Sequence, residues 1–226
     1  DAKVSEFEAL RPTLAPDIST QDFLGAIRKL EAIRNLGARL DAYPQLAFAA
    51  NTQDQAVVTF LGTVQDRLAA VNNRTLFFTL WWKQLDEPSA ARLLAAAGDV
   101  RYWLEAQRLY RPHTLTEPEE KVINIKNTTG VRALQTLYDS ITNRYVFKLE
   151  VDGEVKELTR GELSIYIRGS DPELRAAAYR ELHRVFSQDS SLLGQLFQAL
   201  LRDWRNENID LRHFASPVAV RNLDND

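Results

Sequence analysis

The 226-residue sequence contains no cysteine and no methionine. Without cysteine, the chain forms no disulfide, has no thiolate nucleophile and cannot build a cysteine-ligated zinc site. The lack of cysteine agrees with a reducing compartment, and we expect a cytoplasmic location. Because an initiator methionine is also missing, we expect that Asp1 is not the natural start and that the sequence is a piece of a longer protein.

Long apolar runs and an excess of charge of one sign are also lacking. No apolar run approaches the roughly 20 residues that a membrane-spanning helix needs, and residues 1–6 lack the basic-then-apolar pattern of a signal peptide. Lys and Arg number 28 against 31 Asp and Glu, a formal net charge of −3. This balance gives no electrostatic case for nucleic acid or an anionic membrane, and we expect neither as a partner.

Helical periodicity is present nearly everywhere. Apolar residues share one face over residues 23–40, and Pro44 is predicted to end that helix. The clearest pattern extends from Val57 to Leu85, where apolar residues alternate at steps of four and three. Such a seven-residue repeat favours packing against a neighbouring helix. The added aromatic residues Phe60, Phe77 and Trp81 broaden the apolar face beyond a plain coiled-coil seam, and the second half of this helix is predicted to lie deep among other helices.

Residues that can cap a helix N-terminus precede most of the later helical patterns. The candidate caps are Asp99, Thr116, Thr129, Thr159, Asp171 and Asp189, and Asp86-Glu87-Pro88 is predicted to restart the chain as a new helix. Two of them have a glutamate three residues later, the spacing of a capping box. The tail from residue 206 to residue 226 is polar and loses periodicity, so no helix is predicted there.

A single segment predicts strands. Residues 145–151 alternate apolar and polar side chains, and Asp152-Gly153 has the composition of a tight hairpin turn. Residues 155–158 would form the returning strand. The predicted fold is therefore mainly α, a multi-helical stack with one small β-hairpin around residues 145–158. With 45% hydrophobic residues, such a chain can bury a core without disulfides or a structural metal.

Candidate catalytic side chains are few. The chain has three histidines, and no two of them are four residues apart: His113, His183 and His213. The His-Glu-x-x-His motif of helical zinc peptidases is therefore absent. A site assembled from the three histidines in space stays open as a less favoured alternative. Glu117, Glu119 and Glu120 follow His113 and could suggest a metal or acid–base cluster, but helix capping and the helix dipole explain them more simply.

Other candidate sites are weaker. Ser164 and Ser216 have no glycine-flanked elbow and no neighbouring base. No glycine pattern that binds phosphate or a dinucleotide occurs. The aromatic residues Phe77, Phe78, Trp81 and Trp82 could line a ligand groove, but their heptad spacing favours a place in the core. Residue types and spacing alone thus predict a helical domain without catalytic residues.

Four segments, in order, carry a resemblance to a known family. The first is the run Arg111-Pro112-His113-Thr114-Leu115-Thr116-Glu117-Pro118-Glu119-Glu120-Lys121-Val122-Ile123, followed by Lys126 to Gly130. The others are residues 158–163, residues 171–179, and Phe214-Ala215-Ser216-Pro217 with Arg221-Asn222. Together they resemble oligoendopeptidase F and its relatives. Residues 1–100 match that family by helical pattern and by Leu76-Phe77-Phe78-Thr79-Leu80 more than by motif.

The resemblance implies a two-lobed, mostly helical zinc peptidase that hydrolyses short peptides inside a closed channel. In that family the zinc is held by His-Glu-x-x-His and a later glutamate, and the motif glutamate is the general base. These residues would lie beyond Asp226, so the resemblance places no catalytic residue and no metal ligand in this chain. Its expected cofactor is zinc in the full-length protein, and its expected partners are short peptide substrates and the missing carboxy-terminal catalytic lobe.

The resemblance also divides the chain by role. Residues 1–110 are expected to form an amino-terminal helical region, residues 111–187 a helical segment with the hairpin, and residues 188–226 the start of the catalytic lobe. A second hypothesis remains beside this one. It holds that the chain is a non-catalytic helical interaction or regulatory module that shares the fold.

Overall fold

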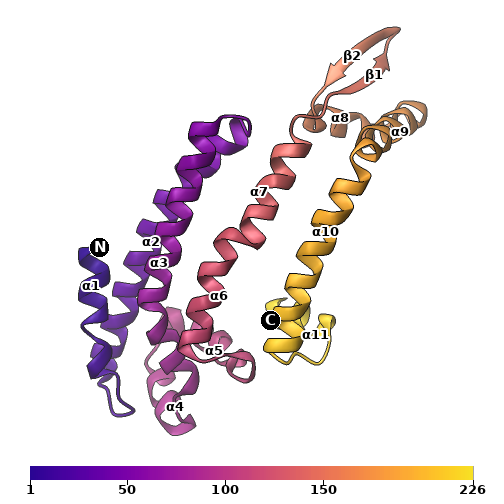
Figure 1. Ribbon diagram of the computed structural model, residues 1–226. Coiled ribbons are helices and arrows are strands. Elements are labelled where there is room, and N and C mark those ends of the chain that lie inside the picture. Colours follow the sequence, from indigo (N-terminus) through magenta and orange to yellow (C-terminus); the bar gives the residue numbers. More distant parts are fainter. Residues whose placement is uncertain (226) are drawn as a thin grey trace. The chain divides into compact units, whose positions relative to one another are not determined.

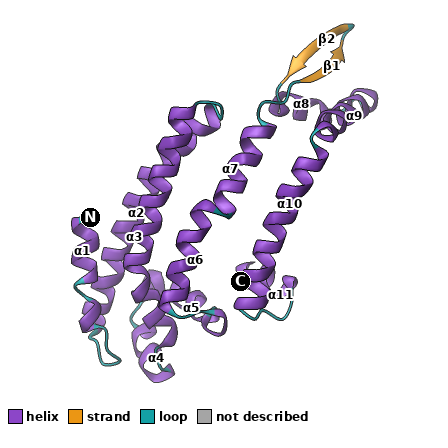
Figure 2. Cartoon of the chain, viewed as in Figure 1, coloured by secondary structure: helices purple, strands orange, loops and turns teal. Residues whose placement is uncertain are grey.

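The computed structural model describes residues 1–225, which form helices and one small two-stranded sheet (Figures 1 and 2). This confirms the mainly α fold class with a single hairpin. The described chain divides into two compact units, one of residues 1–130 with 203–225 and one of residues 131–202. These limits differ from the expected division at residues 110 and 187. That division was based on the expected function of each part, and it stays a prediction.

The larger unit is built from helices that pack mainly along the long helix α3. Its α-helices are α1 (Ala2–Glu8), α2 (Thr20–Ala50), α3 (Gln55–Gln84), α4 (Glu87–Ala95), α5 (Arg101–Leu109), α6 (Glu117–Thr129) and α11 (Pro217–Asn225). Short 3₁₀ helices cover Arg11–Thr13, Gly98–Val100 and Arg111–His113, and a π-helix covers Asn206–Leu211. Helix α3 packs against α1, α2, α5 and α6, as Figure 1 shows for α2 and α6.

The predicted long helix is confirmed, and its second half lies in the core. Phe78 and Trp82 are almost fully buried and pack against Phe23 of α2, with ring centroids 6.0 and 5.2 Å away. The indole N–H of Trp82 donates a hydrogen bond of 2.9 Å to the Leu104 carbonyl. A buried indole needs such an acceptor, since an unpaired donor would cost folding free energy. Phe77, Phe78 and Trp82 of α3 are therefore core residues rather than the wall of a groove. Trp81 packs against this core and is partly buried, whereas Phe60 is 45% exposed.

Helix α2 does not end at Pro44 as predicted. It continues to Ala50 with Pro44 inside it. A proline in a helix interior removes one backbone hydrogen bond. Pro44 is fully buried, and Phe48, four residues on and so on the same face, is 6% exposed. Burial of these two side chains offsets the lost bond, a tertiary contribution that local sequence rules omit.

The smaller unit contains α7 (Val131–Thr142), β1 (Phe147–Val151), β2 (Glu154–Leu158), α8 (Arg160–Ile167), α9 (Pro172–Gln188) and most of α10 (Ser190–Arg205). Strands β1 and β2 pair antiparallel, with Val151 opposite Glu154. Asp152 and Gly153 have φ angles of 57° and 80°, the left-handed values that a two-residue hairpin turn requires. The buried face of the hairpin packs on α8 and α9.

Most of the predicted helix starts are confirmed. Asp86 and Asp171 cap α4 and α9 through their side chains, and Thr116 and Thr159 form capping boxes at α6 and α8. At Thr159, the Glu162 amide donates to the threonine hydroxyl at 3.3 Å while the Glu162 carboxylate accepts from the Thr159 amide at 2.7 Å.

Two predicted caps and the predicted tail are wrong. Thr129 is the last residue of α6, and its hydroxyl donates back to the Lys126 carbonyl at 3.4 Å. Asp99 lies inside the 3₁₀ helix Gly98–Val100, and Val100 is the N-cap of α5. Asp189 directly precedes α10 as predicted, and its carbonyl accepts from the Leu193 amide at 2.9 Å, but its carboxylate accepts from the Tyr145 hydroxyl at 2.7 Å. The tail expected to lack periodicity forms the π-helix and α11. In the part of the chain that the structure describes, no helix has the length and apolar character needed to cross a bilayer.

Candidate functional site

Two of the family-like segments meet inside the larger unit. The segment from Arg111 forms a 3₁₀ turn that ends at His113, and the returning segment passes through Arg212 to Phe214. The imidazole of His113 stacks on the ring of Phe214, with centroids 3.6 Å apart and planes inclined by 14°. His113 Nδ1 donates a hydrogen bond of 2.8 Å to the Arg212 carbonyl. This bond holds Nδ1 protonated when the imidazole is neutral.

A shielded ion pair lies beside this stack. The guanidinium of Arg212 makes two parallel hydrogen bonds to the Glu120 carboxylate, of 2.7 and 2.9 Å. The two side chains are only 16% and 13% exposed. Arg212 also pairs with Glu207 at 2.9 Å and donates to the His113 carbonyl at 3.2 Å. The arrangement joins residues that are 92 positions apart in the sequence.

The ion pair changes the pKa of both partners. Burial raises the pKa of Glu120, but hydrogen bonds from Arg212 and from the Leu115 amide, with attraction to Arg212 and Lys83, lower it more. Hydrogen bonding to Glu120 raises the pKa of Arg212 despite its burial. Both groups therefore stay charged at neutral pH, and Glu120 is unsuited to act as a general base.

A cavity of about 310 Å³ adjoins the ion pair. Its walls include Leu80, Tyr110, Trp204 and Phe214, with Lys83 and Arg212 among the charged residues. The Lys83 ammonium lies 5.7 Å from the centroid of the Tyr110 ring. Burial lowers the pKa of Lys83, and attraction to Glu120 opposes this effect. The residues around this cavity form ion pairs and packing contacts.

The Tyr110 phenol in this cavity stays protonated. Its hydroxyl donates to the Asp224 carboxylate at 2.7 Å. Burial and this hydrogen bond raise the pKa of Tyr110 to about 12. The phenol therefore does not act as a base near neutral pH.

Each glutamate of the family-like motif has a structural partner. Glu117 accepts hydrogen bonds from Arg11 at 2.6 and 3.0 Å and from Lys121 at 2.7 Å. Glu119 accepts from the Thr116 amide at 2.9 Å, and Glu120 pairs with Arg212. The interpretation of these residues as helix capping and scaffold agrees with these contacts. Residue types could identify the caps, but no local signal marked Arg212 as the partner of Glu120.

The histidines do not form a metal site. Among residues 1–225, no group of three or more His, Asp or Glu side chains could hold a metal ion. His183 is exposed and lies edge-on to Tyr179, with centroids 4.7 Å apart. His213 is exposed and has a φ of 56°. The described residues therefore do not fit the zinc that the resemblance implies.

The two serines considered as nucleophiles have local backbone roles. The Ser164 hydroxyl donates to the Gly161 carbonyl at 2.6 Å, within its own helix. The Ser216 hydroxyl accepts from the Ala219 amide at 3.2 Å, at the start of α11. No base among the described residues is hydrogen-bonded to either hydroxyl.

Comparison with known proteins tests the resemblance. Residues 81–147 match the protein family described as Oligopeptidase F. The resemblance to oligoendopeptidase F is confirmed. The oligopeptidase F match contains the Arg111–Gly130 segment that carries the strongest motif. A search of curated proteins finds no match.

Solved structures extend the likeness at the level of the fold. Oligoendopeptidase F from Enterococcus faecium is similar over 97% of this chain, with a TM-score of 0.75 and 17% identity. A protein from Chlamydophila abortus, assigned as a peptidase, is similar over 83% of the chain, with a TM-score of 0.50 and 18% identity. The chain covers 45% and 32% of those two chains, so it spans less than half of their length.

Proposed function

We propose that this chain is the amino-terminal part of a zinc-dependent oligoendopeptidase that hydrolyses short peptides inside a closed channel. The observation that carries the proposal is the oligopeptidase F match over residues 81–147, within a fold similar to oligoendopeptidase F over 97% of the chain. The metal-binding residues and the general base would be supplied by a carboxy-terminal lobe. The proposed location is the cytoplasm, in agreement with the cysteine-free sequence.

The pairing of the motif residues supports a scaffold role for this part. Glu117, Glu119 and Glu120 are each engaged by a cation or a helix cap, so none is free to activate water. A general base needs an unpaired carboxylate within reach of the proton that it accepts. Peptide hydrolysis would then depend on residues of another lobe.

Exposed apolar side chains at the end of α2 support a packing partner. Leu40, Tyr43 and Leu46 are 63%, 70% and 72% exposed, although they lie close together on one helix. Neighbouring exposed apolar side chains can mark an interface. The proposed catalytic lobe is the partner that the fold comparison suggests, since this chain covers 45% of the Enterococcus faecium protein.

The test is peptide cleavage by the full product of the gene that encodes these residues. An internally quenched peptide of a few residues would be cleaved, and a folded protein with the same sequence in a loop would not. A chelator would abolish cleavage, and added zinc would restore it. Residues 1–226 alone, assayed in parallel, would show no cleavage with or without zinc.

Two results would contradict the proposal. Chelator-resistant cleavage would exclude the zinc mechanism, and a complete lack of cleavage by the full product would favour a non-catalytic helical module. A measurable rate from pure residues 1–226 would instead contradict the assignment of catalysis to another lobe.

A further inference from the structure

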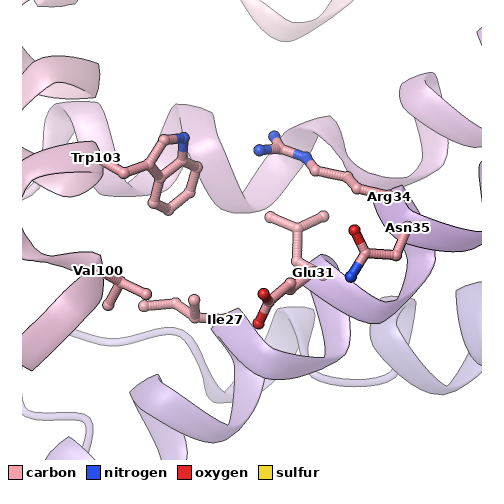
Figure 3. Close-up of a pocket in the computed structure, with 7 residues that line it drawn as sticks. Ile27, Glu31, Arg34, Asn35, Val100 and Trp103 are labelled. Carbon is pink, nitrogen blue, oxygen red and sulfur yellow. The ribbon is translucent and has the colours of Figure 1, made fainter. Parts of the chain in front are cut away.

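A second cavity, of about 250 Å³, lies between α2 and the start of α5 in the larger unit (Figure 3). Ile27 and Leu30 of α2 are buried and contribute apolar surface to it, and Val100 contributes more from the opposite side. Trp103 adds an aromatic wall. None of these residues belongs to the family-like motifs or to the ion pair around Arg212.

Arg34 is the cation at this cavity, and its contact there is with the Trp103 ring. Its guanidinium lies 5.3 Å from the centroid of the Trp103 ring, and Figure 3 shows it directed toward that ring. No hydrogen bond or ion pair joins Arg34 to any residue of the described part of the chain. In the same unit, Arg108 and Arg212 both bond to carboxylates.

The environment of Arg34 favours an anionic partner. Burial lowers the pKa of the guanidinium, although the residue as a whole is exposed. Contact with the face of an indole leaves the N–H donors at the guanidinium edge unpaired. Such a fork matches the two oxygens of a carboxylate, and a partly desolvated site strengthens the pairing. The free N–H donors of Arg34 can therefore bind the two oxygens of a ligand carboxylate.

Two polar residues beside the cavity further restrict which kind of ligand fits it. Asn35 borders the cavity, and its carboxamide can donate to and accept from one peptide group. The carboxylate of Glu31 also borders the cavity, and Figure 3 shows it pointing away from the guanidinium of Arg34. Its negative charge disfavours a ligand that carries more than one negative charge. The preferred ligand is thus a monoanion that has an amide next to an apolar group.

We propose that this cavity binds the carboxyl-terminal residue of a short peptide whose last side chain is apolar. The terminal carboxylate pairs with Arg34, and the preceding peptide group pairs with Asn35. The apolar side chain packs on Ile27, Leu30 and Val100 beside the indole of Trp103. The proposal rests on these contacts alone, so it stands whether or not the parent protein cleaves peptides.

The test compares two probes that differ only in charge. N-acetyl-L-leucine and N-acetyl-L-leucinamide are titrated into residues 1–226, and the indole N–H resonance of Trp103 is followed by NMR. A Trp103→Phe variant assigns that resonance. We expect the acid to bind about two- to fivefold more tightly than the amide, the gain of an ion pair at an exposed arginine.

Three variants test the role of the guanidinium. Arg34→Gln should remove the preference for the acid, whereas Arg34→Lys should keep part of it, because the charge remains but the fork is lost. Arg39→Gln, an exposed arginine on the same helix outside the cavity, should leave the preference unchanged. Thermal unfolding of each variant shows that the comparison is made on folded protein.

The proposal is overturned by any of three results. These are no shift of the Trp103 resonance at millimolar acid, equal affinities for acid and amide, or an unchanged preference in folded Arg34→Gln.

Discussion

At the scale of single residues, the Glu120–Arg212 pair links the segment from Arg212 to Phe214 to the Arg111–Gly130 segment that carries the strongest motif. The low exposure of both side chains distinguishes this pair from the surface pairs elsewhere in the described chain. Removing Glu120 leaves the shielded Arg212 with Glu207 alone as its counter-ion, which costs more than the loss of an exposed pair.

We therefore expect Glu120→Gln to lower the free energy of unfolding by about 2–4 kcal/mol. Glu105→Gln is the matched control, because Glu105 forms an exposed pair with Arg101, and it should cost less than about 0.5 kcal/mol. Urea denaturation of both variants, followed by circular dichroism, measures the difference. Similar values for the two would show that the pair around Arg212 contributes no more than a surface contact.

The same carboxylate predicts a pH dependence. The pKa of Glu120 in the folded protein lies below its usual 4.5. A carboxyl with a depressed pKa stabilises the folded state fully above its unfolded pKa, and the contribution is lost as pH falls through the folded value. Stability should therefore decrease as the pH falls below about 4.5, and the decrease should be smaller in Glu120→Gln. An identical pH profile in the variant would exclude Glu120 as a source of the effect.

At the scale of elements, the sequence predicted correctly those features that depend on residues close together in the chain. The heptad pattern of α3, the turn at Asp152-Gly153 and the boxes at Thr116 and Thr159 depend on neighbouring residues, and all are confirmed. At Asp189 the predicted helix start is correct, but the carboxylate bonds to Tyr145, which is 44 residues away and could not be identified from neighbouring residues.

Long-range contacts also explain the other misses. Helix α2 passes Pro44 because that ring is buried. The tail folds where Arg212 meets Glu120, a pairing over 92 residues that no periodicity could indicate. The candidate site was accordingly predicted only in part, since His113 and the glutamates were noted but their partners in the tail were not.

Two glycines of the smaller unit give a prediction with opposite signs. Gly153→Ala should destabilise the protein by about 1 kcal/mol, because a φ of 80° is strained for a residue with a Cβ. Gly194→Ala should stabilise it by up to about 1 kcal/mol, because Gly194 is exposed inside α10 and no atom lies within 4 Å of the added Cβ. Thermal unfolding compares the two directly. Equal signs would contradict the assigned turn or helix.

At the scale of the whole molecule, the chain combines a helical fold similar to that of oligoendopeptidase F with the absence, in its described part, of any group of three side chains that could hold a metal ion. The Enterococcus faecium protein is more than twice as long as the segment that this chain covers. Glu117, Glu119 and Glu120 each have a hydrogen-bond partner within the chain, and the end of α2 exposes apolar side chains. These features support the proposal that chemistry resides in another lobe and that this part shapes and completes the peptidase.

The most direct measurement is zinc content together with short-peptide cleavage, determined side by side on the full gene product and on residues 1–226. The account predicts stoichiometric zinc and cleavage for the full product, and neither for residues 1–226. A full product that binds no zinc and leaves short peptides intact would contradict the account.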